Sequence, residues 1–152
     1  MAGEATLFTK IISGDIPCCE VAKGESWLAF LDINPRRPGH TLVVPHEAKK
    51  HLAELSLPQL SALWMGVMEA QRRLKAHFQT DDFSIGIHDG PIAGQEVPHV
   101  HIHLLPRTAG DGGLSMLACW PEALPPGSVE PDFTALNELA EALRDIGEGH
   151  GG

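Results

Sequence analysis

Three histidines stand at every second position of the segment PHVHIHLLPR, residues 98–107. They are His99, His101 and His103, and apolar residues lie between them. Successive side chains of a β-strand point to opposite faces of a sheet. The alternation therefore predicts a strand whose apolar face lies in the core and whose other face presents three imidazoles together.

The middle imidazole of this row has the chemistry of a nucleophile. A histidine with the reference pKa of ~6.5 is mostly neutral at pH 7 and offers an unprotonated ring nitrogen. The other ring nitrogen must donate its proton to an acceptor, and the backbone carbonyl of His99 is one candidate acceptor for His101. Attack on phosphorus would form a phosphoramidate, and the flanking imidazoles would stabilise the phosphoryl oxygens. The array therefore favours phosphate-ester chemistry at His101.

The row of histidines is also compatible with two simpler roles. The histidines can stand on the solvated face of an ordinary strand, or they can bind a metal ion, since histidine is the commonest metal ligand. Residues four apart on a strand are ~13 Å apart, whereas zinc holds nitrogen ligands at ~2 Å. His99 and His103 therefore cannot easily share one ion, and a metal site would need two of the histidines and a partner elsewhere.

A long amphipathic helix is the clearest of the elements that must position this row. Ser56 and Gln59 match a capping box, and Pro58 stands in the first turn. Apolar residues then recur every three or four positions to about His77 or Phe78. The pattern predicts one helix from Ser56 to the end of this run.

The other predicted elements are short and, with the long helix, favour an α+β fold. In the terminal helix, Asp132 is the predicted cap and Gly147 the predicted stop. The short elements are a helix at 7–13, strands at 27–33, 40–46 and 83–88, and the terminal helix at 133–146.

Length and composition limit what the protein can do. The 152 residues predict one domain, residues 1–110, and a C-terminal extension, residues 111–152, with one helix packed on the same domain. A formal net charge of -9 disfavours nucleic acid and anionic membranes as partners. No run approaches ~18 apolar residues, and the first residues lack the apolar run of a signal peptide. Three cysteines, two of them adjacent, make a poor disulfide framework, so a cytoplasmic protein is expected.

The run GQEVPHVHIHLLPR resembles the signature of the histidine triad (HIT) family of nucleotide hydrolases and transferases. The runs FTKIISGDIP, AFLDINPRRPGHTLVVP and DGPIAGQ resemble other blocks of that family in the same order, and the resemblance covers roughly residues 7–107. It implies a HIT-like α+β fold, in which an antiparallel sheet carries a long central helix and a short N-terminal helix. The C-terminal helix would be an addition to that fold.

The resemblance also assigns catalytic roles. His101 matches the nucleophile that takes up the nucleoside monophosphate, His103 matches a phosphate contact, and His99 matches an orienting support. Gln95 matches a glutamine that hydrogen-bonds near the scissile bridge and positions water. A primary amide donates and accepts without changing charge, which suits both half-reactions.

Other positions of the resemblance concern the substrate. Asp32 matches an acid that binds the ribose hydroxyls. Phe8, Phe30 and Ile33 resemble the apolar walls around the base, with plain core packing as the alternative for each of them.

Three further positions carry alternatives. His40 is expected to be a hydrogen-bonding group behind the site or a buried structural histidine. His88 stands where relatives often carry an Asn or Gln that touches phosphate, and it either does the same or ends the strand. Glu96 stands where relatives carry Ser or Thr, and a carboxylate there would repel phosphate, so we leave Glu96 outside the site.

No metal site is expected. Some bacterial relatives bind structural zinc through a Cys-x-x-Cys near the start, but here the corresponding stretch is Thr6-Leu7-Phe8-Thr9. Ala48 stands where a further histidine ligand would be.

The resemblance implies nucleotidyl transfer from a nucleoside phosphate or phosphoramidate to His101, followed by hydrolysis. DGPIAGQ and HLLPR resemble the dinucleoside polyphosphate hydrolase branch, the fragile histidine triad type, slightly more than the phosphoramidase branch. The expected partners are a small nucleotide and a second copy of the chain. No cofactor is expected to bind tightly, although magnesium can arrive with the substrate. The alternatives are a nucleotide-binding protein with little turnover, which Glu96 would allow, and a histidine-ligated metalloprotein.

Overall fold

The computed structural model describes residues 5–148. Within them the chain forms two compact units, the first ending at Gly113 and the second beginning at Leu114. The predicted packing of the terminal helix on the first domain stays a prediction. No helix among residues 5–148 is both long and apolar enough to cross a membrane.

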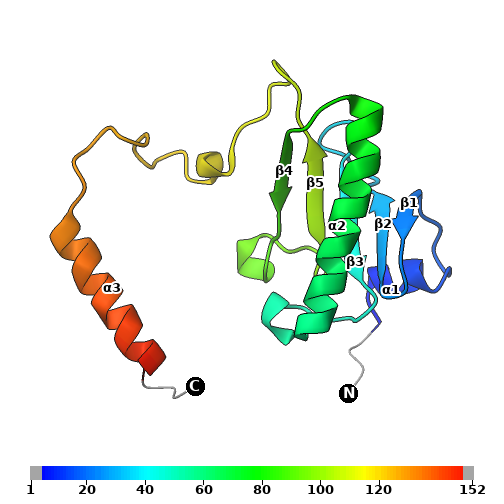
Figure 1. Ribbon diagram of the computed structural model, residues 1–152, viewed down its shortest axis with the longest axis horizontal. Coiled ribbons are helices and arrows are strands. Elements are labelled where there is room, and N and C mark those ends of the chain that lie inside the picture. The colour runs from blue at the N-terminus through cyan, green and yellow to red at the C-terminus, as the bar shows by residue number, and fades with distance from the viewer. Residues whose placement is uncertain (1–4, 149–152) are drawn as a thin grey trace. The chain divides into compact units, whose positions relative to one another are not determined.

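The first unit is built on a five-stranded antiparallel sheet (Figure 1). Its strand order is β1-β2-β3-β5-β4, so β3 is the central strand and the sheet ends at β1 and β4. The predicted α+β class with an antiparallel sheet is thereby confirmed. The strands are β1 (Glu20–Lys23), β2 (Trp27–Leu31), β3 (Thr41–Pro45), β4 (Phe83–Gly86) and β5 (Ile102–Pro106).

The predicted long helix covers one face of this sheet. It is α2 (Leu57–Phe78), and Ser56 and Gln59 form the expected capping box at its start. Its buried residues pack with the alternate residues of the strands that point towards it, which is the expected consequence of the strand period. The cluster contains Ala22, Ala29, Val43, Leu55, Leu63, Val67, Ala70, Leu74, Val100, Ile102 and Leu104.

A smaller helix and a second cluster lie on the other face. Helix α1 (Leu7–Ile12) follows Thr6, whose side chain accepts a hydrogen bond from the backbone N–H of Thr9. Phe8 of this helix packs with the strand residues that point away from α2, namely Leu28, Phe30, Leu42 and Val44. Since Ile102 and Leu104 face α2, the histidines beside them in the sequence face this second cluster.

The expected extent of the histidine strand was wrong. The ladder of β5 begins only at Ile102, so His99 and His101 precede the strand instead of lying in it. The alternative of a solvated histidine face does not hold, because α1 covers these residues: His99 is fully buried and His101 is 6% exposed. Strand β1 was not predicted at all, since its four residues combine charged and apolar side chains without a clear alternation.

Short 3-10 helices and the terminal helix complete the structure. These are η1 (Leu52–Glu54), η2 (Pro91–Ala93) and η3 (Met116–Cys119), and α3 (Phe133–Glu148) follows in the second unit. The carboxylate of Asp132 accepts the backbone N–H of Ala135, as expected of the predicted cap. The helix continues one residue beyond Gly147, the predicted stop.

Candidate active site

Four imidazoles gather on the α1 side of the sheet around His103. Its ring centroid lies 5.0 Å from that of His101, 5.2 Å from that of His40 and 5.3 Å from that of His88. Register explains part of this arrangement, because Leu42 of β3 pairs with His103 of β5 and His40 stands just before β3. Histidines from three separate segments of the chain thus form one cluster.

His99 is held in one tautomer by two hydrogen bonds. Its Nε2 lies 2.7 Å from the carbonyl of Pro45, which can only accept, so Nε2 carries the proton. Its Nδ1 lies 2.7 Å from the hydroxyl of Thr6, which therefore donates to it. Burial lowers the pKa of His99. His99 is therefore neutral and fixed in one orientation.

His101 has the geometry expected of a nucleophile. Its Nδ1 donates to the carbonyl of His99 at 2.7 Å, and this is the acceptor that the sequence predicts. With the proton on Nδ1, the lone pair of the ring is at Nε2. Burial is the main cause that lowers the pKa of His101, and the bond to His99 opposes it. The imidazole therefore stays neutral near pH 7 and keeps Nε2 available.

His40 orients His103 through a second hydrogen-bond chain. The backbone N–H of Arg36 donates to Nδ1 of His40 at 3.1 Å, so His40 carries its proton on Nε2. That Nε2 lies 2.9 Å from Nδ1 of His103 and donates to it. In neutral His103 the proton is consequently on Nε2, a buried atom without a hydrogen-bond partner among the residues that the structure describes. Burial, followed by the neighbouring imidazoles, lowers the pKa of His103 to about 4. His103 thus offers a buried N–H donor.

One group of possible metal ligands occurs in this cluster. Single atoms of Asp32, His40 and His103 lie within 4.8 Å of one another. A metal ligand must offer a lone pair, but the single lone pair of neutral His40 already accepts the N–H of Arg36. Binding through Nε2 would require this bond to break or the ring to become an anion. The donor set therefore fits a hydrogen-bond chain better than a cation.

The predicted substrate residues lie in different surroundings. Asp32 accepts the backbone N–H of Asn34 at 2.8 Å, and its other oxygen lies 3.6 Å from Nε2 of His40. Ile33 beside it is 87% exposed, so its side chain is free to contact a ligand. Phe8 and Phe30 are both buried in the second cluster, and the ring of Phe8 lies 5.6 Å from that of His99 and 5.0 Å from that of His101. Phe8 thus packs directly against the row of histidines.

Gln95 is fixed by the segment that precedes η1. Its amide donates to the carbonyl of Lys50 at 2.8 Å, and the N–H of Val100 donates to the carbonyl of Lys49 at 2.7 Å. At the start of the same loop, the carboxylate of Asp89 accepts the N–H of Leu52. Backbone groups therefore hold both ends of the loop that carries Gln95.

Several of these contacts could not be predicted from residue types. The pair Lys49-Lys50 indicates only solvated charges, although the carbonyls of these residues hold the loop. Thr6 enters the sequence prediction only as a missing zinc ligand, although it supports His99. The run Thr6-Leu7-Phe8-Thr9 before an apolar segment is a capping signal that could have identified Thr6 as a helix start.

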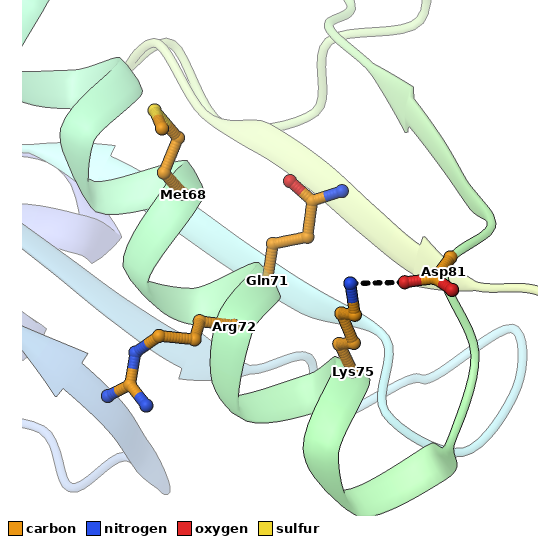
Figure 2. A pocket seen from close by; sticks show the side chains of 5 residues that line it. All are labelled: Met68, Gln71, Arg72, Lys75 and Asp81. Carbon is orange, nitrogen blue, oxygen red and sulfur yellow. Dashed lines mark ion pairs between the residues drawn. The ribbon is translucent and has the colours of Figure 1, made fainter.

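A shallow surface depression lies elsewhere, on α2 (Figure 2). Met68, Gln71, Arg72 and Lys75 of α2 line it, and Asp81 closes it through an ion pair with Lys75. Because α2 and the histidines lie on opposite faces of the sheet, this depression is not part of the candidate active site.

Comparisons with known proteins show the family of the chain. Residues 13–110 match the family described as HIT domain. Adenosine 5'-monophosphoramidase of Saccharomyces cerevisiae is 34% identical over 141 residues, which are 91% of this chain and 80% of that protein. The asymmetrical bis(5'-nucleosyl)-tetraphosphatase of Schizosaccharomyces pombe is 41% identical over 83 residues, which are 55% of this chain and 46% of that protein. The match thus spans about half the length of the second relative.

A solved structure extends the likeness along most of the chain. SMU.412c from Streptococcus mutans UA159 has a TM-score of 0.79 at 35% sequence identity. The alignment covers 95% of this chain and 86% of that one. The HIT-like fold expected from the sequence is confirmed.

Proposed function

The chain belongs to the HIT family, and from this premise we propose that it is a nucleotide hydrolase that works through a covalent intermediate on His101. The observation that carries the proposal is the hydrogen bond from Nδ1 of His101 to the carbonyl of His99. This bond leaves the lone pair of a neutral imidazole on Nε2, as attack on phosphorus requires.

The reaction would proceed in two displacements. Nε2 of His101 bonds to the phosphorus of a nucleoside phosphate, and the electron pair of the scissile bond goes to the leaving group. Water then attacks the same phosphorus, the N–P bond breaks, and its electron pair returns to Nε2. The N–H at Nε2 of His103 would stabilise the phosphoryl oxygens in both steps. The amide of Gln95 would position the water.

The remaining site residues would bind the nucleoside. Asp32 would accept hydrogen bonds from the ribose hydroxyls, since a carboxylate accepts on two oxygens. Ile33, Phe8 and Phe30 would form apolar walls near the base, and His40 would hold His103 in its donor tautomer.

Two substrate classes fit this mechanism. The two named relatives are a phosphoramidase and a dinucleoside tetraphosphatase. We therefore propose nucleoside phosphoramidates and dinucleoside polyphosphates as substrates, with adenosine as the first base to test. Magnesium would enter with a polyphosphate. We also propose a cytoplasmic homodimer, for which the unpaired edge strand β4 and the exposed Trp64, Met65 and Met68 of α2 offer a surface.

A trapping experiment tests the intermediate. Diadenosine tetraphosphate labelled at its outer phosphates is mixed with excess protein and quenched in alkali, because the P–N bond to imidazole is labile in acid. The protein should carry label, and His101→Ala should carry none and lose at least ~10³-fold in turnover. His77→Ala is the matched control, since His77 is exposed at the end of α2. Turnover of His101→Ala within tenfold of the unaltered protein would refute the nucleophile, and unlabelled protein that binds tightly would indicate a binding protein.

A further inference from the structure

Among the clustered imidazoles, the ring of His88 is the one exposed to solvent. It follows β4 and is exposed, whereas His40, His99 and His101 are buried. Its ring centroid nevertheless lies only 5.3 Å from that of His103. His88 therefore stands at the open side of the candidate active site, beside the buried N–H donor of His103.

A glycine of the neighbouring loop lies against the His88 ring. Gly94 has a φ of +103°, and a Cβ built there would lie 3.3 Å from Nδ1 of His88. Gly94 immediately precedes Gln95, so the loop that carries the amide passes beside this ring. The ring of His88 thus lies close both to Gly94 and to the ring of His103.

His88 can carry a proton on both ring nitrogens without losing a contact. Protonating His40 would place a second N–H against a donor, the backbone N–H of Arg36. His88 forms no hydrogen bond or ion pair with any residue of the described range 5–148. Imidazole is the side chain that ordinarily changes charge between pH 5 and 8.

The charges around the cluster make such a cation useful. Asp32 and Glu96 are carboxylates close enough for their charge to act on His101, and both would repel phosphate oxygens. His101 and His103 face His88 as neutral rings, and Gly94 carries no charge. Asp89, which follows His88, accepts the backbone N–H of Leu52 and lies 3.4 Å from Nδ1 of His51. A substrate with several phosphates therefore meets repulsion that a cationic His88 would offset.

We propose that His88 selects the leaving group: as an imidazolium ion it binds the phosphate oxygens beyond the phosphorus that bonds to His101. This inference rests on the proposed function. It predicts that a leaving group with phosphates is favoured over an amine, because an amine offers the imidazolium no anionic oxygen. When the bridging P–O bond breaks, its electron pair goes to the leaving phosphate, and the added negative charge lies next to His88.

The pH profile of kcat/KM tests the role of His88. Diadenosine tetraphosphate is a suitable substrate because its phosphates carry only strongly acidic protons and do not titrate near neutral pH. We expect kcat/KM to fall by up to about tenfold from pH 6 to pH 8, since a hydrogen bond from a charged donor to a phosphate oxygen is worth about one factor of ten. His88→Asn should remove this fall, and His88→Lys should keep the value high at pH 8. His77→Asn, an exposed histidine outside the site, should retain the fall.

Two comparisons exclude a merely structural role. With adenosine phosphoramidate, His88→Asn should change kcat/KM less than twofold, and its effect on the tetraphosphate should shrink at high salt because the contact is exposed. An equal loss on both substrates, or an unchanged pH profile in His88→Asn, would overturn the inference.

A binding measurement separates this inference from the proposed function. In His101→Ala, which cannot form the intermediate, diadenosine tetraphosphate should bind more tightly at pH 6 than at pH 8 by calorimetry. Adding His88→Asn should remove the difference. If the difference persists, His88 is not the cationic ligand, whatever the trapping experiment gives. If it disappears while no label forms on His101, the proposed function fails and the anion contact remains.

Discussion

Replacing Thr6 by Val removes one hydroxyl and retains the shape of the side chain. The hydroxyl accepts the backbone N–H of Thr9 at the start of α1 and donates to Nδ1 of His99. Nδ1 of His99 cannot find another arrangement by changing tautomer, because Nε2 must keep its proton for the carbonyl of Pro45. The substitution therefore leaves a buried ring nitrogen without a partner.

The expected cost follows from these two contacts. Loss of a helix N-cap costs about 0.5–2 kcal/mol, and a buried acceptor without a partner costs about 1–3 kcal/mol. Thr6→Val should therefore lower the free energy of unfolding by about 1.5–5 kcal/mol in total. This is a large part of the 5–15 kcal/mol typical of a domain.

Urea denaturation of Thr6→Val and Thr6→Ser measures this cost. Ser keeps the hydroxyl and loses one methyl group, so Thr6→Ser should lose only about 1 kcal/mol. The midpoint should shift for Val without a change in slope, since the same surface is exposed on unfolding. If Thr6→Val is as stable as Thr6→Ser, the hydroxyl does not support His99 as described.

Three further perturbations test other contacts. The pKa of His103 is about 4 in the folded protein and about 6.5 in the unfolded chain, so the unfolded chain binds more protons between these values. The stability that neutral His103 contributes is therefore present above pH 6.5 and is lost as the pH falls. The free energy of unfolding should drop by about 2 kcal/mol from pH 7 to pH 5, and His103→Gln should not show this drop. Gly94→Ala should lower the free energy of unfolding by about 1–2 kcal/mol because of the positive φ, and it should raise KM for polyphosphates by displacing His88. Gly14 also has a positive φ, but no atom lies near a Cβ built there, so Gly14→Ala should change only the stability. His40→Phe should lower kcat roughly tenfold, because His103 then lacks the donor that fixes its tautomer, and an unchanged rate would contradict that role.

Local signals in the sequence predicted the parts of the fold that depend on local interactions. The capping box at Ser56 and the apolar period set the start and end of α2 correctly. The hydrogen bond from Nδ1 of His101 to the carbonyl of His99 could also be predicted, because the two residues are only two positions apart. Such contacts join residues a few positions apart, so they can be predicted from the local sequence pattern.

Contacts between distant segments could not be predicted in the same way. Thr6 and His99 are 93 residues apart, and His40 and His103 are 63 apart, so only the folded sheet brings them together. The burial of the histidine face depends on α1, a helix of six residues, packing over it. Strand β1 forms because it pairs with β2, although its own residues show little preference for a strand.

Strand β3 fixes two distances of the active site at once. His40 precedes its first residue and contacts His103, while the carbonyl of Pro45, its last residue, contacts His99. The length of this one strand therefore sets the distance between the groups that contact His103 and His99. An added residue inside it would move one end by ~3.3 Å, further than either hydrogen bond can stretch. The length of this strand is consequently as much a requirement of the chemistry as the histidines themselves.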